Sequence, residues 1–318
     1  PSRQHPDNTT PVDAGIGDAD SPEAGCMAFN PKLPFRARDA LAAGLTRRAL
    51  ASSRFRRLLP GVYVDARVPV TPLLEARAVM QLLPVDGFVS HHTAARLLGG
   101  VVPHDENLHA SVPAHRNRSR KLGLQVHRST RTPVTFDGVR TTSPTATFID
   151  LAGVLGLVDT VVLGDSLVRK GLASPARLVR AAASAPDRLR TRAVRAAALV
   201  RARVDSPMET RTRLLLLLAG LPEPQIDIEF RDDHGIVRRR VDMGYRKARL
   251  GIEYARNGEE DALALSGSVE IAGLQVDALR ADGAEGGTLV RVRRIELGLD
   301  RLEPLAARYA FGALLLEA

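Results

Sequence analysis

Residues 206–256 read SPMETRTRLLLLLAGLPEPQIDIEFRDDHGIVRRRVDMGYRKARLGIEYAR, and they decide the fold of the second half of the chain. Their first four residues, Ser-Pro-Met-Glu at 206–209, combine an N-cap serine, a proline at the first helical position and a glutamate at the third. The run Leu214–Ala219 is apolar on every face of a helix, which indicates burial. Gly220 fits the C-terminal cap and Pro222 cannot continue the helix, so the helix is predicted to end there.

Three runs typical of β-strands follow this helix, at 225–230, 236–243 and 249–254. In the first run, isoleucine alternates with acidic residues, as expected for a strand with two different faces. Asp-Asp-His-Gly at 232–235 is a turn signal, and 245–248 provides a second short connection. The sequence therefore predicts a meander of three antiparallel strands.

The second and third strands carry two acidic residues whose spacing suggests a metal site. A hairpin that closes at Lys247 and Ala248 would place Asp242 and Glu253 nearly opposite each other. Two carboxylates side by side in an antiparallel pair repel each other unless a cation lies between them. Mg²⁺ prefers oxygen ligands, and a bound divalent cation can activate water and stabilise charge on a phosphodiester. We therefore expect Asp242 and Glu253 to bind Mg²⁺.

Glu209, Asp242 and Glu253-Tyr254, in this order, resemble the core of the PD-(D/E)xK nucleases. The stretch is most similar to the branch related to very-short-patch-repair (Vsr) endonucleases, which includes many uncharacterised actinobacterial proteins. The resemblance implies a restriction-endonuclease-like α/β domain that acts as a Mg²⁺-dependent endodeoxyribonuclease. It further implies that Glu209 assists as a ligand or base. Lys247 or Arg240 would neutralise the phosphate, although neither stands at the usual lysine position of the motif.

The resemblance continues downstream, but the sequence departs from it at several points, which include the absence of the family's Trp after Gly286-Gly287. The family has an Asp-x-x-Arg helix and then a strand with an arginine, which 277–280 and 289–292 match. Ala-Arg at 255–256 stands where the family has Asp-Gly, and no histidine follows in 257–273. The missing acidic residue removes a metal ligand or a water-positioning group. The sequence therefore matches the family pattern well for the fold, but it lacks part of the pattern for catalysis.

The same acidic residues also have structural interpretations. Glu209 is the residue type that completes a helix capping box, and it needs no further role there. Asp242 and Glu253 are alternatively surface acids paired with Arg240 or Arg249. Whether the domain is an active enzyme or a degenerate one is left open by the sequence.

A separate basic unit is predicted near the N-terminus, over residues 31–68. Helices are expected at Phe35–Ala43 and Thr46–Phe55, followed by a basic turn and a strand ending at Val64. This order resembles the N-terminal winged helix of the AbiEi antitoxin family from type IV toxin–antitoxin systems, which implies double-stranded DNA as a partner and a cognate toxin. Thr46–Phe55 would be the recognition helix. The alternative is a solvated arginine-rich face on a structural domain. The residues expected to contact DNA are Arg47, Arg48, Arg54, Arg56 and Arg57.

Residues 69–204 are predicted to form a mixed α+β middle domain with a helical connector. His91 and His92 are adjacent, so they cannot bind a metal from one helix face, and we expect one to be buried and the other exposed. The basic loop 116–121 between two predicted strands is either a contact for a nucleic-acid backbone or a solvated hairpin loop. At Ala146, the related actinobacterial proteins usually have an arginine.

The remaining segments and the composition limit which kinds of structure and location the chain can have. Residues 1–30 are poor in apolar side chains and are expected to be a disordered tail, 257–267 a surface loop and 299–316 a closing helix of the domain 205–318. Lys and Arg exceed Asp and Glu by 45 − 36 = 9, which is compatible with nucleic-acid binding. The single cysteine excludes an internal disulfide. We found no signal peptide and no 20-residue apolar span, which predicts a cytoplasmic protein. The sequence also has no phosphate-binding loop and no dinucleotide fingerprint.

Together these features predict an α+β multidomain protein with a winged helix, a mixed middle domain and a PD-(D/E)xK-like C-terminal domain. The expected function is a DNA-binding protein with a nuclease-type domain, active or degenerate. The alternative is a non-enzymatic, antitoxin-like transcriptional regulator.

Overall fold

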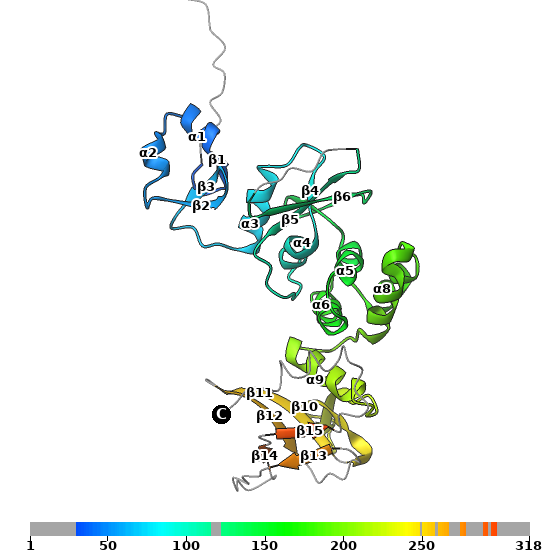
Figure 1. The fold of residues 1–318 in the computed structure, drawn as a ribbon. Helices are drawn as coiled ribbons and strands as arrows, with labels where there is room; N and C mark the ends of the chain where they lie inside the picture. Colours follow the sequence, from blue (N-terminus) through cyan, green and yellow to red (C-terminus); the bar gives the residue numbers. More distant parts are fainter. Residues whose placement is uncertain are drawn as a thin grey trace, which may run out of the picture.

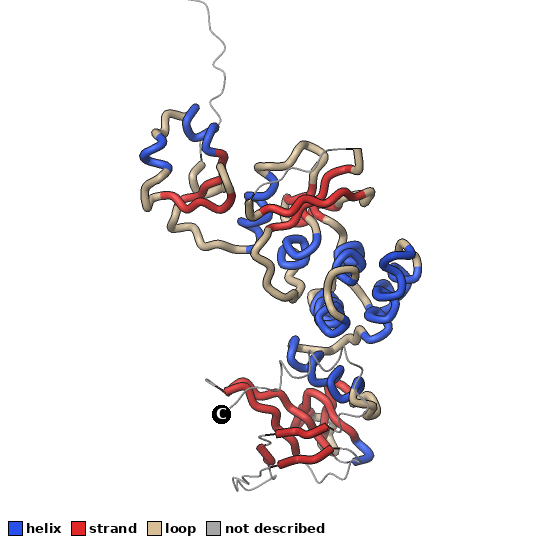
Figure 2. The backbone as a smooth tube through the Cα atoms, in the orientation of Figure 1, coloured by secondary structure: helices blue, strands red, loops and turns tan. Residues whose placement is uncertain are grey.

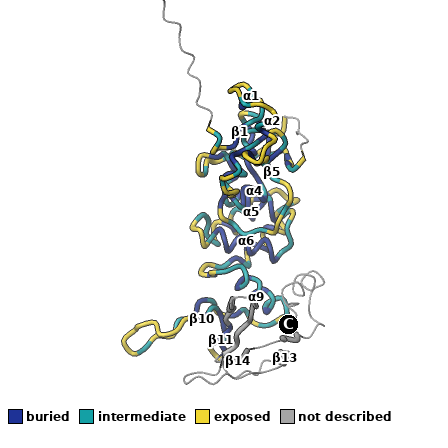
Figure 3. The backbone as a smooth tube through the Cα atoms, turned by 90° about the vertical axis from the view of Figure 1, so that its left-hand side faces the viewer, coloured by how far each residue is buried: buried dark blue, intermediate teal, exposed yellow. Residues whose placement is uncertain are grey.

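The computed structural model describes residues 30–115, 122–248, 250–257, 260–266, 274–277, 289–291 and 294–297, with the backbone alone described at 248 and from 253 onward. The described parts follow one another along an elongated molecule (Figures 1 and 3). A small N-terminal sheet is followed by a larger mixed sheet, a group of helices and an antiparallel C-terminal sheet (Figure 2). Several sheets combined with helices confirm the α+β class.

The N-terminal unit is a three-stranded antiparallel sheet, of order β1-β3-β2, with two short helices. Phe35, Ala40, Leu50 and Phe55 form its small core. The rings of Phe35 and Phe55 meet edge to face, with their centroids 5.6 Å apart. The elements are β1 (Phe35–Arg36), α1 (Ala37–Ala42), α2 (Arg47–Leu50), β2 (Phe55–Leu59) and β3 (Val62–Asp65).

Helix α2 is shorter than the sequence predicts. Thr46 caps it as expected, accepting a hydrogen bond from the N–H of Ala49 at 3.1 Å. The helix nevertheless ends at Leu50, and the hydroxyl of Ser52 donates to the carbonyl of Ala49 at 2.6 Å in the turn that follows. Phe55 starts strand β2 instead of ending the helix, because its ring is buried in the small core. The helix expected over residues 46–55 is therefore only one turn long.

The middle sheet is mixed, with the strand order β6-β5-β4-β8-β7. Its strands are β4 (Phe88–Val89), β5 (Leu108–Pro113), β6 (Leu124–Ser129), β7 (Val134–Phe136) and β8 (Val139–Thr141), and helices α3 (Pro72–Met80) and α4 (His91–Leu97) pack beside it. Strands β5 and β6 are parallel. A hairpin joins antiparallel strands, so the hairpin interpretation of the connection between them is wrong.

A group of helices joins the middle sheet to the C-terminal sheet. They are α5 (Pro144–Ala152), α6 (Leu157–Arg169), α7 (Pro175–Ala183), α8 (Asp187–Leu199) and α9 (Pro207–Leu218). Phe148, Leu163, Leu178 and Leu214 belong to one continuous apolar core that also includes α4 residues. At Gly164 an added Cβ would lie 2.4 Å from a methyl carbon of Val200, so this close approach requires glycine.

The C-terminal sheet contains the meander that the sequence predicts. It has the order β14-β12-β11-β10-β9, and its neighbouring strands are antiparallel. The strands are β9 (Gln225–Arg231), β10 (Val237–Tyr245), β11 (Leu250–Asn257), β12 (Glu260–Ser266) and β14 (Leu289–Arg291), while β13 (Leu274–Asp277) pairs separately with β15 (Arg294–Leu297). An added Cβ at Gly244 would lie 2.2 Å from the carbonyl oxygen of Leu250, so the hairpin tolerates only glycine at this position.

One expectation for the end of the chain is wrong. Residues 257–267 were expected to form a surface loop, but Glu260–Ser266 pair with β11 as strand β12. Leu263 and Leu265 alternate with smaller residues there, which was the signal for a strand. Asp277 ends strand β13, and the remainder of the expected Asp-x-x-Arg helix at 277–280 lies outside the described residues. The expected closing helix at 299–316 lies outside the described residues, as does the expected tail except for its last residue.

Helix α9 is where the helices meet the C-terminal sheet, and it was predicted correctly from its caps. The hydroxyl of Ser206 accepts a hydrogen bond from the N–H of Glu209 at 3.1 Å, and Gly220 has a φ of +86° just after the helix. Figure 1 shows α9 between α6 and strands β10 and β11. The buried carboxylate of Asp165 on α6 binds Arg213 on α9, with Nη2 and Oδ2 3.1 Å apart. Arg213 is fully buried and also donates to Glu223 at 2.9 Å.

Among the described residues, no helix is long and apolar enough to cross a membrane.

Candidate functional site

The neighbouring strands β9, β10 and β11 of the C-terminal sheet are aligned so that their apolar residues share one face. Met243 of β10 lies opposite Ile226 of β9 and opposite Ile252 of β11. Met243, Ile252 and the neighbouring Val241 are buried. Because side chains alternate along a strand, the residues between these positions belong to the other face.

That other face carries a row of acidic positions. Continuing both registers by one residue places Asp242 opposite Asp227 on β9 and opposite Glu253 on β11. The expected pairing of Asp242 with Glu253 therefore follows from the hairpin as it is formed, and Asp227 extends the row to a third strand. Adjacent carboxylates in a sheet destabilise it unless positive charge compensates them.

Glu209 comes to this row from helix α9. Its side chain is 7 % exposed, and Oε2 accepts a hydrogen bond from the N–H of Asp205 at 2.9 Å. Burial raises the pKa of Glu209, and the negative charges of Asp242 and Asp205 raise it further, against the lowering effect of hydrogen bonds from the Asp205 N–H and Ser206. Glu209 therefore caps helix α9 and also lies close enough to Asp242 for the charge of Asp242 to change the pKa of Glu209. The structure brings both residues together from segments that are far apart in sequence.

Asp227 is a member of the site that the sequence analysis missed. It is 9 % exposed and has a φ of +54°, which is uncommon for a residue other than glycine. Its carboxylate binds both Arg240 and Arg203. Although burial opposes it, hydrogen bonds from these two arginines lower the pKa of Asp227. The alternation of isoleucine and acid in β9, read together with the register, was the signal for this residue.

Arg240 and Arg249 were the expected partners of Asp242 and Glu253, and the structure describes only Arg240. Arg240 binds Asp227, and its Nη2 lies 2.9 Å from Oδ2 of Asp205. Arg240 thus links the start of α9 to the acidic row. Arg249 lies outside the described residues.

Lys247 is placed away from the acidic row. It is exposed in the short 3₁₀ turn Arg246–Ala248, beyond the end of strand β10. Asp242 lies three residues before that end, about 10 Å along the strand at ~3.3 Å per residue. The structure therefore places Lys247 at the tip of the hairpin.

All five arginines expected to contact DNA are exposed, but they do not form a single helical face. Arg47 and Arg48 lie on α2, Arg54 lies in the following loop, and Arg56 and Arg57 lie on β2. Neighbouring residues of a strand point to opposite faces, so Arg56 and Arg57 point in different directions. The guanidinium of Arg56 donates to the carbonyl of Ala66 at 3.2 Å, and that of Arg54 lies 5.3 Å from the ring centroid of Phe55.

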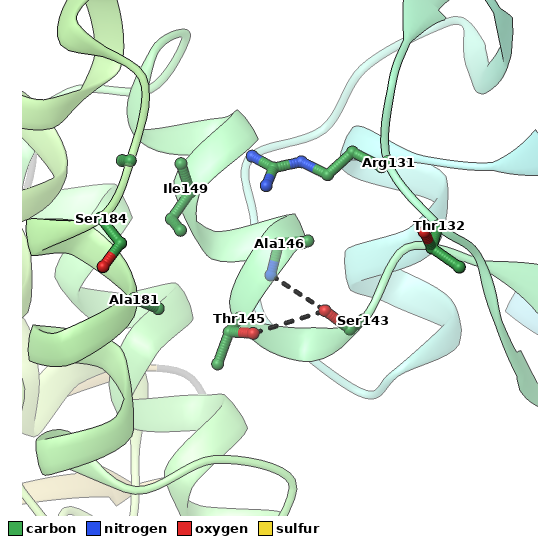
Figure 4. A pocket seen from close by; sticks show the side chains of 9 residues that line it. Arg131, Thr132, Ser143, Thr145, Ala146, Ile149, Ala181 and Ser184 are labelled. Atoms are coloured by element: carbon green, nitrogen blue, oxygen red, sulfur yellow. Dashed lines mark hydrogen bonds between the residues drawn. The ribbon is translucent and has the colours of Figure 1, made fainter.

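An open pocket of about 370 Å³ lies where α5 meets the middle sheet and α7 (Figure 4). Ala146, the position at which the sequence departs from the family pattern that it resembles, lines it. Arg131 reaches toward the pocket from the sheet side, but its guanidinium binds Asp150, with Nη2 and Oδ1 2.6 Å apart. Its charge is therefore already neutralised by the protein.

The histidine pair on α4 is partly as expected. His92 is buried and His91 is half-buried. The two rings do not act as a pair, because His92 faces Asp105 and His109 while His91 stacks on His127 with centroids 3.8 Å apart.

Comparisons with known proteins do not identify a family. No family model and no curated protein matches the chain. Among solved structures, the crystal structure of the RV2827C protein from Mycobacterium tuberculosis has a TM-score of 0.35 and 15 % identity, covering 62 % of this chain and 79 % of that one. A similarity at this level carries no argument about fold or function.

Proposed function

We propose that this chain is a DNA-binding protein whose C-terminal sheet holds a Mg²⁺-dependent, nuclease-type site acting on phosphodiester bonds. The observation that supports the proposal is the meeting of Glu209, Asp242 and position 253. One comes from a helix and two from neighbouring strands. This is the arrangement that the resemblance to PD-(D/E)xK nucleases implies. The same resemblance assigns the helix–helix–hairpin order of residues 35–65 to a winged helix.

The carboxylates of this site fit a hard divalent cation. Asp242 and Glu253 are the ligands that we assign, with Glu209 as a third ligand or as a base. The raised pKa of Glu209, caused by burial and by the charge of Asp242, indicates negative charge that a cation would offset. A bound Mg²⁺ would supply activation of water and stabilisation of charge on the phosphodiester. The protein's own part is to hold Glu209 by its capping bonds at a fixed position relative to β10.

Positive charge around the site comes from arginine. Arg240 and Arg203 already bind Asp227, so they neutralise that acid and leave a smaller net negative charge facing an incoming phosphate. We assign Arg240 the role of positioning the acidic row. The exposed arginines 47, 48, 54, 56 and 57 supply contacts to the backbone of double-stranded DNA.

One observation favours a second function. Ala255 stands where the resembling nucleases have an acid, and it faces Ala262 on β12 rather than another ligand-bearing residue. With this ligand missing, the domain would bind DNA or a toxin partner without cutting, as an antitoxin-like transcriptional regulator.

Nicking of supercoiled plasmid at low salt separates the two functions. The wild type, Glu253→Gln and the exposed control Asp233→Asn would be compared with Mg²⁺ or Mn²⁺ and with EDTA. Metal-dependent nicking by the wild type and Asp233→Asn, lost in Glu253→Gln, supports the nuclease. A salt-sensitive gel shift without nicking in any variant supports the regulator. If the protein shows no nicking and no gel shift, both proposals are overturned.

A further inference from the structure

A second cluster of possible metal ligands lies in the middle unit, far from the acidic row along the chain. It consists of His92 on helix α4, His109 on strand β5 and Asp105 in the loop that leads into β5. One ligand atom from each residue lies within 4.8 Å of the other two. We propose that these three residues form a binding site for a divalent transition metal ion, with Zn²⁺ as the ion that fits best.

The spacing of the three side chains suits such an ion. Nε2 of His109 lies 3.2 Å from Oδ2 of Asp105, and Nδ1 of His92 lies 3.8 Å from the same oxygen. Ligand atoms bound tetrahedrally to zinc at about 2.0–2.2 Å lie roughly 3.3–3.6 Å apart. Two of the separations are thus close to those around a bound ion, and all three ligand atoms lie within 4.8 Å of one another.

The two imidazole nitrogens that face Asp105 have no other partner. His92 is 6 % exposed and His109 is 4 % exposed, and neither Nδ1 of His92 nor Nε2 of His109 makes a hydrogen bond. The 3.2 Å approach of His109 to Asp105 is not aligned as a hydrogen bond, and the 3.8 Å separation of His92 from Asp105 is too long for one. Buried polar side-chain atoms are normally satisfied. A metal ion between the three residues would satisfy both nitrogens and the carboxylate at once.

The surrounding residues hold the ligands in place. Nδ1 of His109 lies 3.0 Å from Nε2 of His127, which fixes the ring and leaves Nε2 of His109 directed toward Asp105. Metal-binding histidines usually make such a bond through the second nitrogen. Oδ1 of Asp105 accepts the N–H of Asn107 at 2.8 Å, so its other oxygen is the one that faces the histidines.

His91 gives independent support for a constrained cluster. Its backbone has a φ of +49°, and its ring stacks on His127. Metal ions bind imidazole through the lone pair of the neutral ring.

The ligand types identify the class of ion. Two imidazoles with one carboxylate suit zinc and related divalent ions, whereas Mg²⁺ prefers oxygen ligands and keeps its water. Asp105 is about a quarter exposed, with 27 % of its side-chain surface accessible, so water can reach the cluster and complete the coordination. This is the arrangement of a site with three protein ligands and one open position.

Metal content and titration of the untagged, full-length protein test the site. Elemental analysis is followed by chelation, and Zn²⁺ is then titrated by calorimetry into the wild type, Asp105→Asn and Glu106→Gln. Asn at 105 keeps the oxygen that accepts the Asn107 N–H, so this variant retains the loop. Glu106 is the exposed neighbour and loses the same charge.

We expect one Zn²⁺ per chain in the wild type and in Glu106→Gln. Asp105→Asn should lose at least about 10-fold in affinity, and His127→Gln about 10–100-fold as a supporting residue. The Co²⁺ form should show the visible absorption bands of a four-coordinate site, and Asp105→Asn should lose them. Equal affinity in Asp105→Asn and the wild type would assign the binding to surface histidines and overturn the proposal. The absence of binding would overturn it as well, leaving a packed network of neutral histidines.

Discussion

The two candidate metal sites are built in opposite ways. In the middle unit, two buried imidazoles and one carboxylate lie close together where helix α4 packs against strand β5. In the C-terminal unit, acidic positions lie opposite one another on neighbouring strands, and helix α9, which an ion pair joins to α6, brings Glu209 near Asp242. The first cluster carries little charge without its ion, whereas the second concentrates negative charge. The two regions should therefore differ in metal preference, in pH dependence and in how much they depend on the rest of the chain.

The largest expected effect tests whether the acidic site depends on the helices. Arg213→Met leaves Asp165 buried without its cation and should lower the free energy of unfolding by about 3–5 kcal/mol. Urea unfolding followed by circular dichroism measures it. Arg188→Met, an exposed change on α8, is the control and should stay within about 0.5 kcal/mol of the wild type. Equal stability of the two variants would show that the ion pair does not hold α9 in place.

The second prediction concerns the acidic row itself. Asp242→Asn should reduce metal-dependent nicking at least about 100-fold, because it removes a charge that stabilises the transition state through the cation. The rate of plasmid nicking measures the loss, with Asp233→Asn as the exposed control. Residual nicking at the wild-type rate would remove Asp242 from the site.

The third prediction uses pH to separate the regions. Burial and neighbouring negative charge raise the pKa of Glu209, so the folded chain binds the proton of this residue more tightly than the unfolded chain does. The free energy of unfolding therefore falls as the pH rises from about 4.5 through the raised pKa. Burial and the neighbouring histidines lower the pKa of His91 from 6.5 to about 3, so stability falls in the other direction, as pH drops from 6.5 toward 3.

Melting curves between pH 4 and pH 8 measure both effects, each worth about 1.4 kcal/mol per unit of pKa shift. Glu209→Gln should remove the fall in stability that begins above about pH 4.5, and His91→Asn should remove the fall that begins below about pH 6.5. Asparagine tolerates the positive φ at position 91. An unchanged curve in both variants would contradict the contrast between the regions.

The smallest effect concerns the N-terminal arginines, which belong to neither metal site. Arg47→Ala combined with Arg48→Ala should weaken DNA binding equally for all sequences and reduce the slope of affinity against salt by about 1 per arginine. Fluorescence anisotropy at several salt concentrations measures the slope, with Arg188→Ala as the control. If the slope is the same in all three proteins, α2 does not contact the phosphates.

Local patterns were enough to predict one region but not the other. The caps of α9 and the alternation of β9 to β11 are contiguous in sequence, and one hairpin fixes the register of Asp242 and position 253. The histidine cluster instead depends on the packing of α4 against β5, and Asp105 adds a ligand from a loop. No periodicity in the sequence indicates such a contact.

Other differences have similar physical causes. The parallel pairing of β5 and β6 and the early end of α2 are decided by tertiary packing, which overrides local propensity. Arg213 looks like a surface residue beside a leucine run, yet it is fully buried because Asp165, Glu223 and the carbonyl of Leu199 surround its guanidinium. Only the fold reveals these partners.

The ion pair between α6 and α9 also bears on how this chain can be divided and recombined. A cut after Val204, at the boundary that composition suggests, would separate Arg213 from Asp165 and from the carbonyl of Leu199. A C-terminal fragment that keeps α9 intact must therefore begin before α6. The smallest part of this chain that a recombination event could transfer as a working module is the C-terminal sheet together with the helices that precede it.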